Sequence, residues 1–124
     1  MKKIIIGTAL LVCAIGIGYY FHRKRKPSYD SFEILRLSDI FIWIDDQMKN
    51  VERDSASKYE VNILPNKDTQ KLIKKKNSMA YAVILNRNTE KKTTVISTKV
   101  FYAKSIDVDL DPLNQGKIVV IPIE

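Results

Sequence analysis

The chain has 124 residues, 45% of them hydrophobic, and a formal net charge of +7 at pH 7. Six basic residues and no acidic residue fall within positions 1–26, so positions 27–124 hold 15 basic against 14 acidic side chains. This balance lacks the basic domain or stripe that is typical of nucleic-acid-binding proteins, and we expect no nucleic-acid partner. Positions 27–124 are also too few for more than one domain.

An apolar run opens the chain. Residues 4–21 form 18 consecutive positions without a charged side chain, and at the helical rise they would make about 27 Å of helix. The hydrocarbon core of a bilayer is about 30 Å thick, so this run predicts a single transmembrane helix. Tyr19 and Tyr20 fall at its end, where tyrosine rings favour the headgroup region.

Two alternatives for this run depend on the sequence Val12-Cys13-Ala14. It resembles a signal-peptide cleavage site, and Cys13 is a candidate for lipidation. Cleavage there would leave the apolar residues 15–21 directly before a basic cluster, and Val12 stands where a lipoprotein signal carries a small residue. A buried core helix would not need the basic cluster. We therefore expect an uncleaved signal anchor.

The basic cluster after the run consists of Arg23, Lys24, Arg25 and Lys26. Lys and Arg near the ends of a span favour the cytoplasmic side, and this flank holds more of them than the flank with Lys2 and Lys3. We therefore expect a cytoplasmic domain; the alternatives are a domain outside the membrane or one exported after signal cleavage. In the cytoplasmic orientation the cluster would contact anionic headgroups, with about 1 kcal/mol per Lys or Arg near the surface.

The chain then divides into a membrane anchor with a basic stop at 1–26, a short linker at 27–29 and a small domain at 30–124. The three linker residues span only about 10 Å when fully extended. The domain would therefore lie against the headgroups, which limits its partners to membrane lipids and to proteins at or in the membrane.

The first expected element of the domain is a long helix from Asp30 to about Arg53. Asp30 and Glu33 have the spacing of a capping box. Apolar residues then recur at the helical steps of three and four, at Ile34, Leu37, Phe41, Ile44, Met48 and Val51. A strand is the alternative for the continuous apolar stretch 40–44, which is partly β-branched.

Three apolar residues of this expected helix fall outside its main face, namely Leu35, Ile42 and Trp43. In the interpretation that we favour, the helix packs on a sheet and loops cover these side chains. The alternative is a second face for a partner, because aromatic anchors are common at protein interfaces.

The rest of the domain is mostly strand. We expect strands at 59–64, 79–85, 93–102 and 117–123, and a short helix from Asp68 through 72–76. The polar turn 86–92 would join the second and third of these strands in a hairpin. One long helix packed on a mainly antiparallel sheet of about four strands makes an α+β domain.

Residues that carry catalytic chemistry are sparse. The only histidine, His22, and the only cysteine, Cys13, lie in the anchor. The domain therefore cannot build Ser-His or Cys-His nucleophiles or a zinc site from these ligands. Its single glycine, Gly116, rules out a glycine-rich phosphate loop. We expect no enzymatic activity and no cofactor.

Two charged stretches are candidate binding sites. Residues 107–111 alternate Asp with apolar residues, as an EF-hand loop begins, but Pro112 stands where that loop needs glycine. Alternation along a strand would instead place the carboxylates in solvent. Lys71 and residues 74–76 could bind phosphate, yet cations at a helix C-terminus also complement its dipole. We assign neither a metal site nor a phosphate site.

Together these features predict a non-catalytic interaction or scaffold protein that presents a small α+β domain to a membrane-associated protein. The alternative is a tethered module that binds a lipid headgroup or a small ligand through its basic residues.

Overall fold

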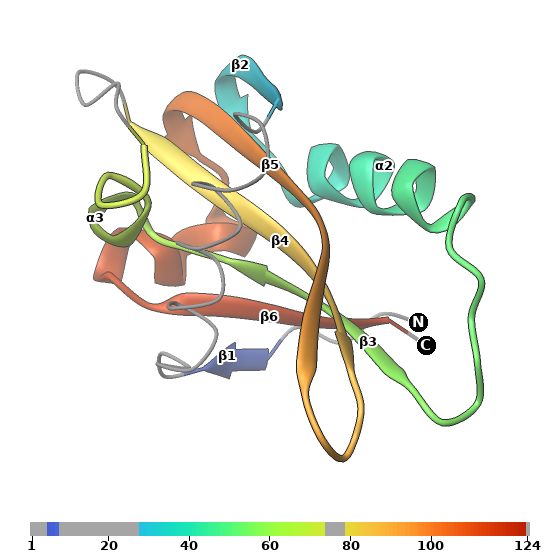
Figure 1. The fold of residues 1–124 in the computed structure, drawn as a ribbon. Helices are drawn as coiled ribbons and strands as arrows, with labels where there is room; N and C mark the ends of the chain where they lie inside the picture. Colours follow the sequence, from blue (N-terminus) through green and yellow to red (C-terminus); the bar gives the residue numbers. More distant parts are fainter. Residues whose placement is uncertain (1–4, 8–27, 74–78, 124) are drawn as a thin grey trace.

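The computed structural model describes residues 5–7, 28–73 and 79–123. In chain order the elements are β1 (Ile5–Gly7), β2 (Ser28–Leu35), α2 (Leu37–Met48), β3 (Lys58–Ile63), α3 (Asn66–Thr69), β4 (Ala80–Asn88), β5 (Thr93–Ile106), the 3-10 helix η1 (Val108–Gln115) and β6 (Ile118–Ile123). The strands form one sheet in the order β1-β6-β3-β4-β5-β2 (Figure 1).

The sheet is mixed. Neighbouring strands run antiparallel everywhere except at β2, which pairs in parallel with β5. The expected α+β class is confirmed. Five strands of six residues or more, rather than about four, make up the sheet, together with the three-residue β1 at its edge.

The long helix expected from Asp30 to Arg53 is wrong at both ends. Residues 28–35 form β2, and α2 runs only from Leu37 to Met48. The helix begins where the backbone N–H of Arg36 donates to Asp39 Oδ2 at 2.9 Å. This cap lies six residues after the pair Asp30 and Glu33 that the sequence suggested. Parallel pairing with β5 holds residues 28–35 in a strand. The spacing of apolar residues within 30–53 gives no information about this distant partner, so it predicted a helix.

The start of β2 also moves the domain boundary. Ser28 and Tyr29, two residues of the expected linker 27–29, belong to the sheet.

The basic cluster 23–26 and most of the expected span 4–21 lie outside the described residues. Ile5–Gly7 are described, and they form strand β1 against β6 in place of the helix expected there. In the described part of the chain, no helix is both long enough and apolar enough to cross a bilayer.

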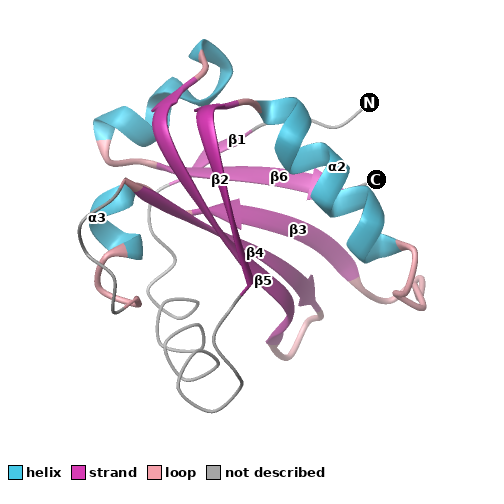
Figure 2. Cartoon of the chain, turned by 90° about the horizontal axis from the view of Figure 1, so that it is seen from above, coloured by secondary structure: helices cyan, strands magenta, loops and turns pink. Residues whose placement is uncertain are grey.

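Helix α2 covers the main core on one face of the sheet. Its residues Ile40 and Ile44 are fully buried, and they belong to one cluster with Val61 of β3, Val83 of β4 and Ile121 of β6. Seen from above, α2 lies along one side of the sheet while α3 lies at its other end (Figure 2). Burial of these aliphatic side chains supplies the main favourable term for folding, about 25 cal/mol per Å² of apolar surface.

Helix α3 packs near the start of β4, on the face with the smaller cluster of Leu64, Ala82 and Ile84. Thr69 is buried there, and its Oγ1 donates to the Leu64 carbonyl at 3.3 Å and accepts from the Ala82 backbone N–H at 2.9 Å. This hydroxyl joins α3 to β4 and to the residue that follows β3. The short helix expected from Asp68 through 72–76 is wrong at both ends, because α3 begins at Asn66, directly after Pro65, and already ends at Thr69.

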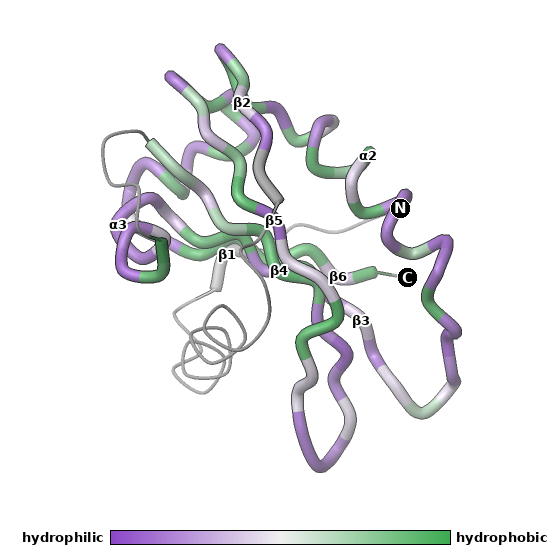
Figure 3. Tube along the Cα trace, turned by 45° about the horizontal axis from the view of Figure 1, so that its top comes forward, coloured by the Kyte–Doolittle hydropathy of each residue, from purple (hydrophilic) through white to green (hydrophobic). Residues whose placement is uncertain are grey.

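The remaining expected strands are confirmed. They correspond to β3, β4, β5 and β6, and the β4–β5 hairpin is closed where the Thr89 backbone N–H donates to the Lys92 carbonyl at 2.9 Å. In Figure 3 the tip of this hairpin is hydrophilic and the middle of β4 is hydrophobic.

Residues 107–111 do not form the strand expected there. Asp107 is the N-cap of η1, and residues 108–111 belong to this helix. Val108 is therefore 77% exposed while Leu110 is buried, although strand alternation would place both on one face.

Gly116 ends η1 in the left-handed region, with φ of 75°. Its N–H donates to the Leu113 carbonyl, and the next N–H donates to the Pro112 carbonyl, so the turn satisfies two carbonyls at the helix end. Residues with a side chain rarely adopt this φ.

We therefore expect Gly116→Ala to lower the free energy of unfolding by about 1–2 kcal/mol, from the cost of placing a Cβ in this conformation. The added Cβ would lie 3.1 Å from Lys67 Cε, but that flexible side chain can move, so the loss comes from backbone strain. Gly116→Asn should lose less, since asparagine tolerates positive φ. Urea denaturation of the purified protein measures both. Equal stability of the glycine and alanine proteins would contradict the assignment.

Candidate functional site: a groove between α2 and strands β2 and β5

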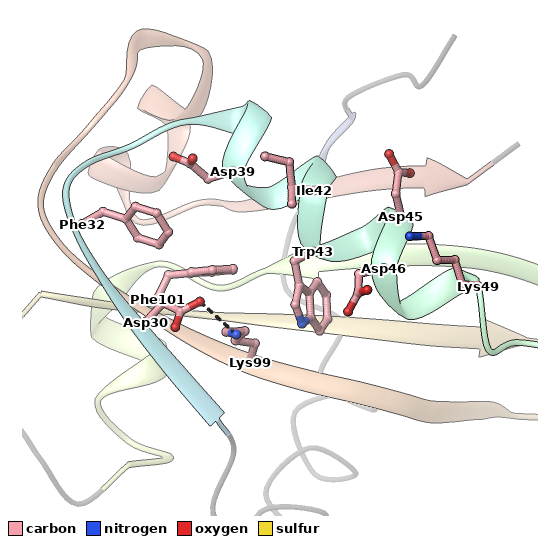
Figure 4. A pocket seen from close by; sticks show the side chains of 10 residues that line it. All are labelled: Asp30, Phe32, Asp39, Ile42, Trp43, Asp45, Asp46, Lys49, Lys99 and Phe101. Carbon is pink, nitrogen blue, oxygen red and sulfur yellow. Dashed lines mark ion pairs between the residues drawn. The ribbon is translucent and has the colours of Figure 1, made fainter.

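A groove of about 580 Å³ lies between α2 and β2, with β5 beneath it (Figure 4). Strand β2 contributes Asp30 and Phe32, and β5 contributes Lys99 and Phe101. Helix α2 contributes Asp39, Ile42, Trp43, Asp45, Asp46 and Lys49. The volume is within the range of ligand-binding clefts, so we describe this groove as the candidate site.

Three aromatic rings line its inner part. The parallel register places Asp30 opposite Phe101, and Phe32 opposite Ala103, so Phe32 and Phe101 lie on the same face of neighbouring strands. Their ring centroids are 5.6 Å apart and their ring planes meet at 54°. Aromatic pairs prefer such tilted arrangements to a face-to-face stack. The Trp43 ring points from α2 toward β5. Trp43 is 7% exposed and Phe101 1% exposed, so core packing fixes both rings.

Charged groups form the outer part of the groove. Lys99 Nζ pairs with Asp30 Oδ2 at 2.9 Å, and the Lys99 side chain is only 18% exposed. The remaining charged side chains all come from α2: Asp39, Asp45, Asp46 and Lys49. The lining thus holds four carboxylates against two ammonium groups, an excess of negative charge on a domain whose total charge is nearly balanced.

The three residues expected for a partner face do not share one exposed surface. Leu35 is fully buried at the end of β2, and Trp43 is nearly buried, whereas Ile42 is 69% exposed. The groove brings Ile42 and Trp43 together and excludes Leu35. Sequence reasoning missed the other eight lining residues. Four of them, Asp30, Phe32, Lys99 and Phe101, are brought to α2 only by the parallel pairing of β2 and β5; the other four, Asp39, Asp45, Asp46 and Lys49, lie on or directly after α2.

The other charged stretches make local contacts in the described part of the chain. Asp111 accepts hydrogen bonds from the Asn114 and Gln115 side-chain amides, both at 3.3 Å, and Asp107 caps η1. Among the described residues no group of three or more His, Cys, Asp or Glu side chains could hold a metal ion. Lys71 faces Asp68 at 3.9 Å, while residues 74–76 and the basic cluster 23–26 lie outside the described residues.

A second polar group lies on the sheet face opposite α2. Asn62 and Asn86 are 3% and 0% exposed, and Asn62 Nδ2 and both polar atoms of Asn86 have no hydrogen-bond partner. Asn86 stands at the bulge where the β4–β5 register shifts. Side-chain amides do not ionise at ordinary pH. In the main core, burial raises the pKa of the Tyr81 phenol, which keeps it protonated. Neither feature supplies acid–base chemistry.

No family of known proteins, no curated protein and no solved structure matches this chain.

Neighbouring positions of α2 should respond differently to truncation. We expect Trp43→Ala to lower the free energy of unfolding by about 3–5 kcal/mol, since it removes a buried ring from the core. Ile42→Ala should change it by no more than about 0.5 kcal/mol, since that side chain is exposed. Chemical denaturation, followed by far-UV circular dichroism, measures both values. A Trp43→Ala protein as stable as Ile42→Ala would mean that the ring is not part of the core.

Proposed function

We propose that this protein is a non-catalytic, membrane-anchored interaction protein whose α+β domain binds a membrane-associated protein through the groove. The observation that carries the proposal is the pairing of Ile42, 69% exposed, with the rigid and nearly buried Trp43, both at the lining of a charged groove. Partner-binding sites commonly combine an apolar centre containing aromatic residues with a polar rim.

The charges of the groove support binding more than catalysis. Asp30 is committed to Lys99 at 2.9 Å, and Asp39 accepts from the Arg36 backbone N–H at 2.9 Å. Asp45 and Asp46 lie on the exposed surface of α2, whereas a general acid or base needs a positioned, desolvated carboxyl group. The domain sequence also offers no histidine or cysteine to act as a nucleophile or base.

Strand β1 sets a condition on the membrane anchor. When Ile5–Gly7 pair with β6, positions 8–21 leave 14 residues, about 21 Å of helix. That length is short of a hydrocarbon core of about 30 Å. A complete span therefore requires residues 5–7 to leave β6. Three residue pairs hold them there.

The alternative function is a tethered module that binds a lipid headgroup or small ligand through basic residues. It has less support in the described residues. Lys99 is engaged by Asp30, and carboxylates outnumber ammonium groups along the groove, which opposes an anionic headgroup there.

Location is tested by thiol labelling. In a Cys13→Ala/Ser55→Cys protein the single thiol lies at Ser55, which is exposed in the loop between α2 and β3. If the domain is cytoplasmic, a membrane-impermeant maleimide should label the membrane-bound protein only after cells are lysed. Labelling of intact cells would contradict this orientation, and recovery of a shortened soluble chain would contradict the anchor.

The binding role is tested by photo-crosslinking in native membranes. A photoreactive residue at Ile42 should form one discrete adduct, because this side chain lines the groove. The matched control is Val108, another exposed aliphatic side chain (77%) on η1, and it should not form that adduct. Mass spectrometry should identify the captured protein as one that co-purifies after mild detergent extraction. Equal adducts at both positions, or none at Ile42, would contradict the proposal.

A further inference from the structure

We infer that the sheet face opposite α2 is the docking site of this chain's own apolar segment, in a form of the protein that is not inserted in a membrane. The segment belongs to the connection 8–27 between β1 and β2. The inference goes beyond the proposed function, which concerns the inserted form. It follows from where the connection ends, which side chains of that face are buried, and which polar atoms are buried there without a partner.

The two ends of the connection 8–27 lie at opposite edges of the sheet. Strand β1 ends at Gly7 beside β6, and β2 begins at Ser28 beside β5, while β3 and β4 lie between. The strand order puts five spacings between β1 and β2, which make about 24 Å. Twenty residues are enough, since they span about 30 Å as a helix and about 66 Å when extended. The connection therefore has to pass from one edge of the sheet to the other.

The face opposite α2 suits an apolar connection better than the face that α2 covers. Helix α2 and the buried leucines of η1 belong to the main core, and the open part of their face is the groove with its charged rim. Of the described helices, α3 alone packs on the opposite face, near the start of β4. Residues 8–21 carry no charged side chain, so they are more stable against apolar strand residues than in water or beside charges.

Side chains beyond the reach of α3 are buried on this opposite face. The strand registers place four of them there: Ala82, Asn86, Thr98 and Val100. Helix α3 bonds to the backbone N–H of Ala82, whereas Asn86 lies four residues further along β4, about 13 Å away. Asn86 is nevertheless fully buried, and Val100 and Thr98 of β5 are only 2% and 8% exposed. This burial requires a cover other than α3, and the connection 8–27 is the longest part of the chain outside the described residues.

Two buried amides on this face favour release of the cover. Asn62 Nδ2 and both polar atoms of Asn86 have no hydrogen-bond partner, at 3% and 0% exposure. A buried polar atom without a partner destabilises the covered state, and it regains hydrogen bonds to water when the cover leaves. Docking is therefore reversible: the apolar segment covers the sheet in water, and it leaves the sheet when a bilayer takes it up.

The test measures distances in the full chain by double electron–electron resonance between nitroxide labels on cysteines. Cys13 is the only cysteine of the chain and carries the first label. Glu60→Cys puts the second label on β3, on the inferred docking face, and Ile42→Cys puts it on the exposed surface of α2, across the sheet. In buffer without detergent we expect a narrow distance distribution for each pair. The distance from Cys13 to position 60 should be the shorter of the two.

A substitution tests the face itself. Thr98→Asp would place a carboxylate beneath the docked segment, where an unpaired charge is costly. We expect it to raise the partition coefficient of the chain into phosphatidylcholine vesicles by about tenfold, which corresponds to about 1.4 kcal/mol. Circular dichroism in maltoside micelles should show an unchanged fold. Thr94→Asp is the matched control, because Thr94 is an exposed threonine of the same strand, and it should partition as the wild type does.

The outcomes separate docking from the proposed function. A Cys13 label no closer to position 60 than to position 42, a broad distribution for both pairs, or a chain that needs detergent to stay monomeric overturns docking. Equal partitioning of Thr98→Asp and Thr94→Asp overturns it as well. The proposed function stands in each of these cases if the Ile42 crosslink forms in membranes. On addition of vesicles both distances should lengthen. Unchanged distances in the presence of vesicles would support docking and overturn the membrane anchor.

Discussion

The parallel pairing of β2 with β5 is the constraint on which the rest of this domain depends. It places Phe32 and Asp30 beside Phe101 and Lys99. It also fixes where α2 begins, because β2 ends at Leu35 and the helix starts two residues later. A connection this short leaves α2 little freedom, so the helix must return along the sheet. The groove is the space between this helix and the strand that leads into it.

How much of the fold could be predicted depended on whether the deciding interactions were local. Strands β3 to β6 carry their own signals: a β-branched or continuously apolar run, bounded by a turn or by proline. Strand β2 carries the wrong local signal, since Asp30 and Glu33 have capping-box spacing and Ile34 begins a helical period. Its true partner lies about 70 positions away, at Lys99 to Ile106. No short-range pattern contains a parallel pairing over such a distance.

The residues of the candidate site follow the same rule: those on a locally encoded helix could be predicted, and those brought in by the distant strand pairing could not. Ile42 and Trp43 could be singled out because they are apolar residues off the main face of a helix that does exist, α2. The expectation that Leu35 shares a partner face with them is wrong, because Leu35 is the buried last residue of β2 and not part of a helix. The ion pair of the groove was not predictable, because Asp30 and Lys99 come together only across the β2–β5 pair.

The same pairing links the two halves of the chain. Since β2 begins at Ser28, a single sequence position separates the basic cluster 23–26 from the sheet, and a membrane anchor of the kind we propose would act on β2 across that short distance. Asp30 and Phe32 of this strand form one wall of the groove. An inserted anchor would therefore hold the groove at a set height and direction relative to the bilayer. Holding a binding site in place lowers the entropy lost when a partner in the same membrane docks, so a shallow, partly charged groove can suffice where a soluble protein would need a larger interface.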